Sequence, residues 1–388
     1  MREGMNDTLQ KLDKIDWEFE KEDTRYLTHS FHPYRSKYIP QIPRNLINLL
    51  SRKSDTVLDC FAGSGTTLVE CSLLGRNGIG IDINPLACLI SKVKSVCIDV
   101  QLLNKQTEIF LNKIREDIFQ VRGVKTLMSF AQNSRSRNVE YKIPQFSYII
   151  NWFQPHVIRE LTIIKKGIDH LHDSYIRNFF LVAFSSILRG VSDAASGFGN
   201  LMINHDPPLK RQIFEKFERK VSVMTATMSK FSEQVDDSVK TEVFLGDARH
   251  LNFIRDRSVD MICTHPPYMA SVPYAEYQKL SLWWLGYDPK KLDAKLIGGQ
   301  RSREDMAKRY LNDMQLSFKE MHRVLKSDKM CCIVIGNPLW RRRIWPLNDI
   351  FKDIGTEVGF RFLKEIVRGK YKTTMGKMKK EYILIFQK

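Results

Sequence analysis

The stretch from Thr56 to Pro85, TVLDCFAGSGTTLVECSLLGRNGIGIDINP, constrains the fold more than any other part of this 388-residue chain. Its pattern predicts a short strand ending at Asp59, a turn of small residues, a helix stopped by Gly75 and a second strand ending at Asp82. Strand, glycine turn, helix and strand make half of a doubly wound α/β nucleotide site. We therefore expect an α/β protein with a ligand crevice at this turn.

The turn itself has the chemistry of a binding site. Gly63 and Gly65 lack Cβ atoms, so the backbone can turn tightly and lie against a ligand. The helix that follows begins with free N–H groups, which suit a carboxylate or a phosphate. Asp82, at the end of the second strand, is placed to accept hydrogen bonds from ribose hydroxyls.

Three kinds of cofactor could use such a turn, and the residues of the turn distinguish between them. A phosphate-binding loop needs Gly-Lys-Ser/Thr, and this turn has no lysine. A dinucleotide site prefers a third glycine where Leu68 stands. S-adenosylmethionine has a carboxylate and a ribose but no phosphate, and it fits what remains; a turn that binds nothing is the alternative. The candidate cofactor residues here are Asp59, Phe61, Ala62, Gly63, Ser64, Gly65, Thr66, Thr67, Asp82 and Ile83.

A second stretch, far downstream, reads as a buried strand that runs into two prolines. Val259 to Thr264 is followed at once by His265-Pro266-Pro267-Tyr268. The prolines end the strand and fix an extended backbone, whose carbonyl groups can face an amino group while Tyr268 stacks on a planar base. The candidate catalytic residues are His265, Pro266, Pro267 and Tyr268. A proline-terminated strand with a core tyrosine is the simpler alternative.

Together the two stretches resemble the DNA amino-methyltransferases, which modify an exocyclic amino nitrogen of cytosine or adenine. DCFAGSGTT is similar to their cofactor motif, GIDINP to their ribose-binding strand end and THPPY to their Ser/Asp/Asn-Pro-Pro-Tyr/Phe catalytic motif. The segment from Phe31 to Leu50, which contains Tyr34, resembles the part that closes over the methionine end of the cofactor. Phe244 to Ala248 resembles the strand end that borders the adenine, which adds Asp247 and Ala248 to the cofactor residues.

The resemblance implies a fold, a reaction and partners. The fold is a doubly wound, mostly parallel, seven-stranded Rossmann-like sheet whose last strand is antiparallel. The reaction is transfer of the methyl group of S-adenosylmethionine to double-stranded DNA with the target base flipped out, without a metal. YAEYQKLSLWWLG, from Tyr274 to Gly286, matches the branch that mostly modifies cytosine N4, so we expect cytosine N4 over adenine N6. A restriction-modification role, with cognate restriction or defence proteins as possible partners, follows from the same resemblance.

One residue departs from the family pattern, because His265 stands where serine, aspartate or asparagine is usual. A neutral imidazole still offers one acceptor nitrogen, but protonation near neutral pH would remove it. Two alternatives are open: an RNA methyltransferase acting on guanine N2 or adenine N6, which resembles this chain in both motifs, and a catalytically silent DNA-binding paralogue, which only His265 favours.

The rest of the chain divides around these motifs. Residues 1–30 read as a polar lead-in, 31–101 and 241–388 as the catalytic domain, and 102–240 as a mainly helical insertion that is a candidate DNA-recognition region. The net charge of +17 suits a polyanionic partner. Seven cysteines without a CxxC pair, and no signal peptide or transmembrane run, favour a cytoplasmic protein without a membrane partner.

Overall fold

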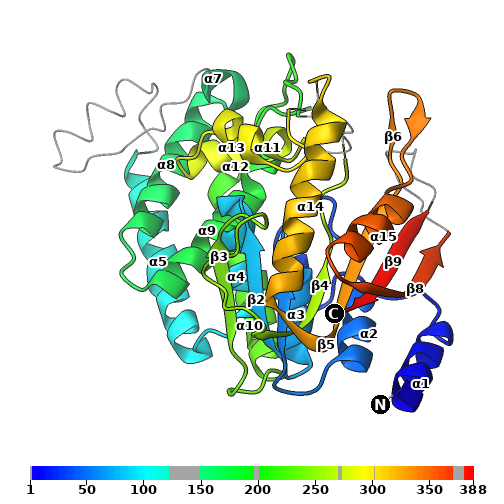
Figure 1. Cartoon of the computed structure of the whole chain (residues 1–388). Coiled ribbons are helices and arrows are strands. Elements are labelled where there is room, and N and C mark those ends of the chain that lie inside the picture. The colour runs from blue at the N-terminus through cyan, green and yellow to red at the C-terminus, as the bar shows by residue number, and fades with distance from the viewer. Residues whose placement is uncertain (1, 122–148, 196–200, 270–272, 301, 370–379) are drawn as a thin grey trace.

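The computed structural model describes residues 2–121, 149–195, 201–269, 273–300, 302–369 and 380–388. A seven-stranded sheet with the order β3-β2-β1-β4-β5-β9-β8 runs through the molecule (Figure 1). Its strands are β1 (Thr56–Asp59), β2 (Asn77–Asp82), β3 (Thr241–Leu245), β4 (Val259–Thr264), β5 (Leu325–Gly336), β8 (Arg361–Arg368) and β9 (Glu381–Gln387). The strands β1 to β5 pair in parallel, and β9 is antiparallel to both β5 and β8. The predicted fold class is confirmed, including the single reversed strand.

The strand order places a crevice where the sequence predicts one. From β1 the chain proceeds outward through β2 to β3, and the later strands β4 and β5 are added on the other side of β1. Ligands of doubly wound sheets bind at this reversal, outside the carboxyl ends of the two central strands. The glycine turn follows β1 and the double proline follows β4, so the two motifs meet at this edge.

Strand β4 is buried along its whole length because helices cover both faces of the sheet. Met261 and Cys263 pack in the cluster that contains α1 (Arg2–Asp13) and α2 (Gln41–Leu50). Ile262, which points to the other face, packs in the cluster under α14 (Met306–Val324) and α15 (Leu347–Glu357). A strand enclosed in this way reads as a continuous apolar run.

The region 102–240 is mainly helical in its described part, as predicted, and lies on the β3 side of the sheet (Figure 1). Residues 122–148 and 196–200 lie outside the described ranges. Its helices pack with α4 (Pro85–Ser95) in one apolar core, which joins Ile90, Phe184 and Met224. The helices are α5 (Val100–Val121), α7 (Ile149–Trp152), α8 (Pro155–Asp169), α9 (Ser174–Val191) and α10 (Ile213–Ser232).

The amino-terminal segment differs from the predicted polar lead-in. It contains α1 and a short 3-10 helix, η1 (Leu27–Ser30), and its few apolar side chains are used in packing. Leu12 and Trp17 are buried in the cluster that holds Ile383 of β9. The Trp17 carbonyl also accepts a 2.6 Å hydrogen bond from Nε of Arg368. The high charge of residues 1–30 conceals this role in the sequence.

Three short helices lie near the cavity. The aromatic segment that starts at Tyr274 is divided at Gln278 into α11 (Tyr274–Tyr277) and α12 (Lys279–Trp284). The segment after Asp288 begins with α13 (Pro289–Lys295), which the Asp288 side chain caps. The sequence signal for the cap, Asp-Pro before a polar run, was present.

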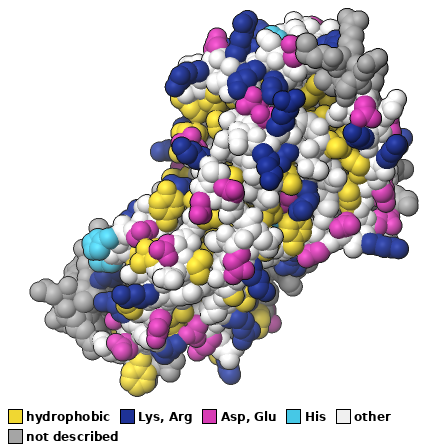
Figure 2. Space-filling view, turned by 90° about the horizontal axis from the view of Figure 1, so that it is seen from below, with side chains coloured by type: hydrophobic (Ala, Val, Ile, Leu, Met, Phe, Trp, Pro, Cys, Tyr) yellow, Lys and Arg dark blue, Asp and Glu magenta, His cyan; other side chains and the backbone are white. Residues whose placement is uncertain are grey.

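The basic sequence at 340–343 forms the tip of a hairpin between β6 (Leu339–Trp340) and β7 (Arg343–Ile344). Arg341 and Arg342 occupy the turn and are exposed. Elsewhere, on the face seen from below, basic and acidic side chains are interspersed (Figure 2). No helix within the described ranges has the length and apolarity to cross a membrane.

Candidate active site

The turn after β1 owes its shape to two glycines at positive φ. Gly65 (φ +76°) directly precedes α3 (Thr66–Leu73), and a Cβ there would lie 2.4 Å from Oγ of Ser91 in α4. Only glycine fits this close approach of the turn to the neighbouring helix. Gly63 (φ +51°) has more space, because a Cβ added there would have Tyr34 Cε1 as its nearest neighbour, at 3.6 Å. Gly65 therefore serves packing, whereas Gly63 lines the cavity.

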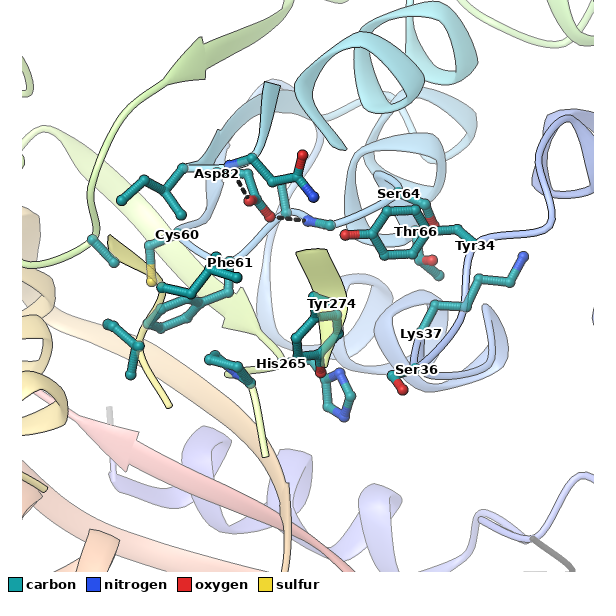
Figure 3. Close-up of a pocket in the computed structure, with 18 of the residues that line it drawn as sticks. Tyr34, Ser36, Lys37, Cys60, Phe61, Ser64, Thr66, Asp82, His265 and Tyr274 are labelled. Carbon is teal, nitrogen blue, oxygen red and sulfur yellow. Dashed lines mark hydrogen bonds between the residues drawn. The ribbon is translucent and has the colours of Figure 1, made fainter. Parts of the chain in front are cut away.

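Asp82 joins this turn to the end of β2. Its Oδ2 accepts a 2.8 Å hydrogen bond from the Gly63 N–H, and its Oδ1 accepts another of 2.8 Å from the Asn84 N–H (Figure 3). Burial raises the pKa of the Asp82 carboxyl to about 6, against the opposing effect of these hydrogen bonds. Each carboxylate oxygen retains acceptor capacity, so Asp82 can still accept hydrogen bonds from a ligand hydroxyl.

The start of α3 presents two hydroxyl groups that have no partner in the described part of the chain. Ser64 Oγ and Thr66 Oγ1 are buried, lack a hydrogen bond within the described structure and line the cavity with Tyr34 (Figure 3). Burying a hydroxyl group without a hydrogen-bond partner costs free energy, and a ligand oxygen that accepts a hydrogen bond from the hydroxyl removes this cost. Lys94 fixes the backbone beneath by donating from Nζ to the Ser64 carbonyl over 2.7 Å. The turn is thus built to hold an acceptor group such as a carboxylate.

Three of the predicted cofactor residues support the turn from behind and do not line the cavity: Asp59, Gly65 and Thr67. Asp59 is 1% exposed. It accepts hydrogen bonds from Thr67 Oγ1 (2.5 Å), Thr264 Oγ1 (2.6 Å) and the Phe61 N–H (3.1 Å). Burial raises its pKa to about 6. The Asp59 carboxyl therefore joins β1, α3 and β4 and cannot reach a ligand.

Gly246, Asp247 and Ala248, after β3, line the far side of the cavity. The Asp247 carboxylate is held by Arg249, whose Nη2 lies 2.6 Å from Oδ2 and whose Nε lies 2.9 Å from Oδ1. Arg249 in turn contacts Asp313 of α14 over 2.9 Å. Burial alone would raise the pKa of Asp247, but the hydrogen bonds from Arg249 hold it below its usual value. The carboxylate is ionised and fixed in direction.

The strand end after β4 places His265 and Pro267 on the cavity wall opposite Gly63, together with Tyr274 of α11. The Pro267 carbonyl accepts a 2.9 Å hydrogen bond from the Tyr310 hydroxyl, which leaves the preceding carbonyls of His265 and Pro266 as acceptors for a target amine. Tyr268 differs from expectation: its ring is 7% exposed and belongs to the core beneath the cavity. Beside this strand end, the tyrosine that lines the cavity is Tyr274 and not Tyr268.

The side chain of His265 lies in a chain of hydrogen bonds that reaches β9. Its Nε2 is 2.8 Å from the Tyr268 hydroxyl, which donates to Oε1 of Glu381 over 2.6 Å. Glu381 also pairs with Arg368, its neighbour across the β8–β9 ladder. The His265 ring stacks on Tyr38, with 5.0 Å between centroids and 11° between planes.

These features define a class of protein. The doubly wound sheet, the lysine-free glycine turn with unpartnered hydroxyls, the acidic residue at the end of β2 and the double-proline end of β4 are the parts of an S-adenosylmethionine-dependent methyltransferase that acts on an amino group. The predicted motifs, although far apart in sequence, line one cavity.

Comparison with known proteins points to the same class. Residues 6–93 match the model of the N6/N4 methyltransferases, described as DNA methylase. The type II methyltransferase M.MjaII of Methanocaldococcus jannaschii is 25% identical over 92% of this chain and 80% of its own length. The type II methyltransferase M.MvaI of Kocuria varians is 25% identical over 89% of this chain and 85% of its own. These matches support a DNA amino-methyltransferase, and the cofactor is S-adenosylmethionine.

A solved structure from Corynebacterium glutamicum, a TehB-like S-adenosylmethionine-dependent methyltransferase, covers 89% of this chain and 86% of that chain. Its identity is 10% and its TM-score 0.33, so the fold assignment rests on the strand order and not on this likeness.

Several cavity residues were missed from the sequence. Lys37 lies on the wall next to Tyr34, and burial lowers the pKa of its ammonium group to about 8. Asn84 lines the cavity and donates from Nδ2 to Gln278 over 2.6 Å. Glu381, which does not line the cavity but bonds to Tyr268 behind it, could have been noticed as a charged residue that begins an otherwise apolar strand. Nothing in the sequence marks Lys37, which is one of many lysines.

Proposed function

We propose that this protein methylates an exocyclic amino nitrogen within a specific sequence of double-stranded DNA, with cytosine N4 preferred over adenine N6. The observation that carries the proposal is the shared cavity, in which Gly63 and Asp82 stand on one side and His265 and Pro267 on the other. Direct displacement requires donor and acceptor to be held in one enclosed place. The type II relatives support a restriction-modification role.

The cofactor residues take separate roles in this proposal. S-adenosylmethionine supplies the methyl group when it is bound. Ser64 and Thr66 donate hydrogen bonds to its carboxylate, since their hydroxyls have no partner among the described residues. Asp82 accepts from the ribose, and the adenine lies by Asp247 and Ala248. Asp59 and Thr67 act indirectly, by holding the turn in shape.

The target base enters the same cavity at the double-proline end. An amine conjugated to a base ring is a poor nucleophile, because its lone pair is delocalised into the ring. Carbonyl acceptors of His265 and Pro266 would orient the amine through its protons and favour attack. The base must leave the duplex to reach them, and stacking in the cavity offsets part of the unstacking cost. Tyr274, which lines the cavity, is the ring placed for that stacking.

Two basic features flank the cavity end of the molecule and are proposed to contact DNA. One is the hairpin tip with Arg341 and Arg342. The other is the segment 201–212 of the helical region, which α8 holds in place: His156 Nε2 lies 2.6 Å from the Lys210 carbonyl. Both stand at the upper end of the view in Figure 1. Phosphate contacts of this kind position DNA without reading its sequence.

The test is methyl transfer from radiolabelled S-adenosylmethionine to duplex DNA and, separately, to RNA of mixed sequence. We expect label on DNA, and N4-methylcytosine in its nucleoside digest by mass spectrometry. N6-methyladenine in the digest would reverse the base preference, and label on RNA alone would reject the DNA substrate. Asp82→Ala is the matched loss-of-function variant.

A silent DNA-binding paralogue is the second candidate, and His265 is the observation that favours it. Its signature would be cofactor bound at the turn without transfer to any nucleic acid. Sequencing of modified bases in DNA from cells that express this chain alone would separate the two candidates and give the recognition sequence.

A further inference from the structure

His265 can serve as the acceptor only if its free nitrogen is the one directed at the substrate. A neutral imidazole has one protonated and one bare nitrogen, and the partner of one decides the state of the other. In this structure Nε2 faces the Tyr268 hydroxyl at 2.8 Å. Nδ1 is the remaining nitrogen, and it has no hydrogen-bond partner among the described residues, although His265 lines the cavity.

The hydrogen-bond chain fixes which nitrogen carries the proton. The Glu381 carboxylate, paired with the Arg368 guanidinium, can only accept. The Tyr268 hydroxyl has one proton and donates it to Oε1 of Glu381 over 2.6 Å. The oxygen of Tyr268 must then accept from His265, so Nε2 carries the proton and Nδ1 is bare.

The surroundings of the ring keep it neutral and in place. Burial lowers the pKa of His265, with Glu381 acting in the opposite direction and Arg368 in the same one. Stacking on Tyr38 fixes the ring plane, and the Tyr38 hydroxyl is itself bonded to Thr67. The titratable or charged groups of the described structure that face the ring are Tyr38, Tyr268, Glu381 and Arg368.

We propose that Glu381 and Tyr268 are positioning residues that hold His265 in the tautomer whose Nδ1 accepts a hydrogen bond from the target amino group. The proposal rests on the proposed function, since it assigns a role within that reaction. When the amino nitrogen forms its bond to the methyl carbon, the carbon–sulfur bond breaks and its electron pair leaves with sulfur. The nitrogen is then positively charged, and it passes one proton to Nδ1. The imidazolium so formed is stabilised by Glu381 through Tyr268 and returns the proton to water.

This arrangement gives His265 the acceptor that serine, aspartate or asparagine supplies in related motifs. The difference is that a tautomer must be chosen, and the choice is made by a residue of another strand. An oxygen atom of serine, aspartate or asparagine can always accept a hydrogen bond, whereas Nδ1 of His265 can accept only in one tautomer. Glu381 selects that tautomer through its hydrogen bond with Tyr268.

Glu381→Gln tests the direction of the chain. Arg368 donates only, so it binds the amide oxygen and turns the amide NH₂ toward Tyr268. Tyr268 would then donate to Nε2, and the proton of His265 would move to Nδ1. We expect kcat for methyl transfer to fall on the order of a hundredfold, as for loss of a positioned acid–base group, with the cofactor dissociation constant unchanged. Glu365→Gln, which removes a carboxylate from the Lys352 pair on β8, is the matched control and keeps kcat.

A second measurement reads the tautomer without catalysis. Nitrogen NMR of protein with labelled histidine shows which ring nitrogen is protonated, with the His265 signals assigned from their loss in His265→Asn. We expect protonated Nε2 in the wild type and protonated Nδ1 in Glu381→Gln. Tyr268→Phe, which keeps the buried ring, should weaken the preference of His265 for the Nε2-protonated tautomer. It should lower kcat less than Glu381→Gln does. In a His265→Asn background, where no tautomer exists, Glu381→Gln should change kcat far less than in the wild type.

The outcomes separate the two proposals. A wild type that transfers no methyl group to DNA would overturn the proposed function. The role proposed for the hydrogen bonds between Glu381, Tyr268 and His265 would then fall as well. Suppose instead that the wild type is active. If its Glu381→Gln variant then keeps kcat, or if wild-type His265 already carries its proton on Nδ1, only the positioning role proposed for Glu381 and Tyr268 is overturned. Should Glu381→Gln fail to fold by circular dichroism, Tyr268→Phe decides by the same two readouts.

Discussion

The Gly63 N–H and the Asp82 carboxylate are 2.8 Å apart, so the turn after β1 is tied directly to the end of β2. One carboxylate therefore shapes the turn and, in the proposed function, also accepts hydrogen bonds from the ribose. The contact makes Asp82 sensitive to substitution in two ways, since removing it loses a ligand group and releases the turn.

Asp82→Ala is expected to weaken cofactor binding by tenfold or more, because charge-assisted hydrogen bonds contribute about 1.5–3 kcal/mol each. Calorimetric titration with S-adenosylmethionine measures the dissociation constant. Asp82→Asn keeps an acceptor for Gly63 and should lose less. An unchanged dissociation constant in Asp82→Ala would show that the ribose lies elsewhere.

Cofactor affinity should also depend on pH through Asp82. Its pKa in the unliganded fold is raised to about 6, so the carboxyl is increasingly protonated below that pH and loses acceptor strength. We expect the dissociation constant to rise as pH falls from 7 to 5, and Asp82→Asn to flatten the profile. The same raised pKa means that this group favours folding at low pH and that its contribution declines as pH rises from about 4 through 6. A dissociation constant that is constant over this range would contradict the assignment.

Asp59→Ala should destabilise the fold without removing a ligand contact. It leaves the buried hydroxyls of Thr67 and Thr264 without their acceptor, at a cost of about 3 kcal/mol in the free energy of unfolding. Urea unfolding measures this cost. Stability equal to that of the wild type would mean that the Asp59 carboxyl does not stabilise the contact between β1, α3 and β4.

Gly65→Ala is expected to be poorly tolerated, because the new Cβ would lie 2.4 Å from Ser91 Oγ and 2.9 Å from its Cα at a φ of +76°. We expect a lower midpoint of thermal unfolding, by several degrees for a loss of about 2 kcal/mol. Gly190→Ala in α9 is the matched control, since nothing lies within 4 Å of its added Cβ. That variant should be neutral or slightly stabilising.

Arg341→Ala with Arg342→Ala should weaken binding to duplex DNA of any sequence. If both contact phosphates, the slope of log affinity against log salt should fall by about 2. Fluorescence anisotropy at several salt concentrations measures the slope, with cofactor affinity as the control. A slope equal to that of the wild type would place the hairpin away from DNA.

The parts of the site that are local in sequence could be predicted, and the parts that depend on distant strands could not. The glycine turn and Asp82 are separated by one helix, so spacing alone indicates that they meet. Glu381 lies 113 residues after Tyr268, and no periodicity relates the two. The burial of Asp59 and of the Tyr268 ring is likewise decided by packing across strands, which is why both were expected in the cavity and are found behind it.

The amino-terminal segment shows the same effect on a smaller scale. A charged composition is typical of a solvent-exposed lead-in, yet Leu12 and Trp17 pack on the sheet. A few scattered apolar residues hardly change the hydrophobic pattern of a sequence, so the pattern does not predict their burial. In the folded chain, however, they pack as well as other apolar side chains against an available face of the sheet.

Because β9 runs against its neighbours, its first residue, Glu381, stands at the edge where β4 ends. During synthesis, a ribosome-bound chain that has not yet exposed residue 381 holds the entire cofactor turn while His265 still lacks the partner that orients it. Competence for methyl transfer would then arise only after the segment beyond residue 380 has docked.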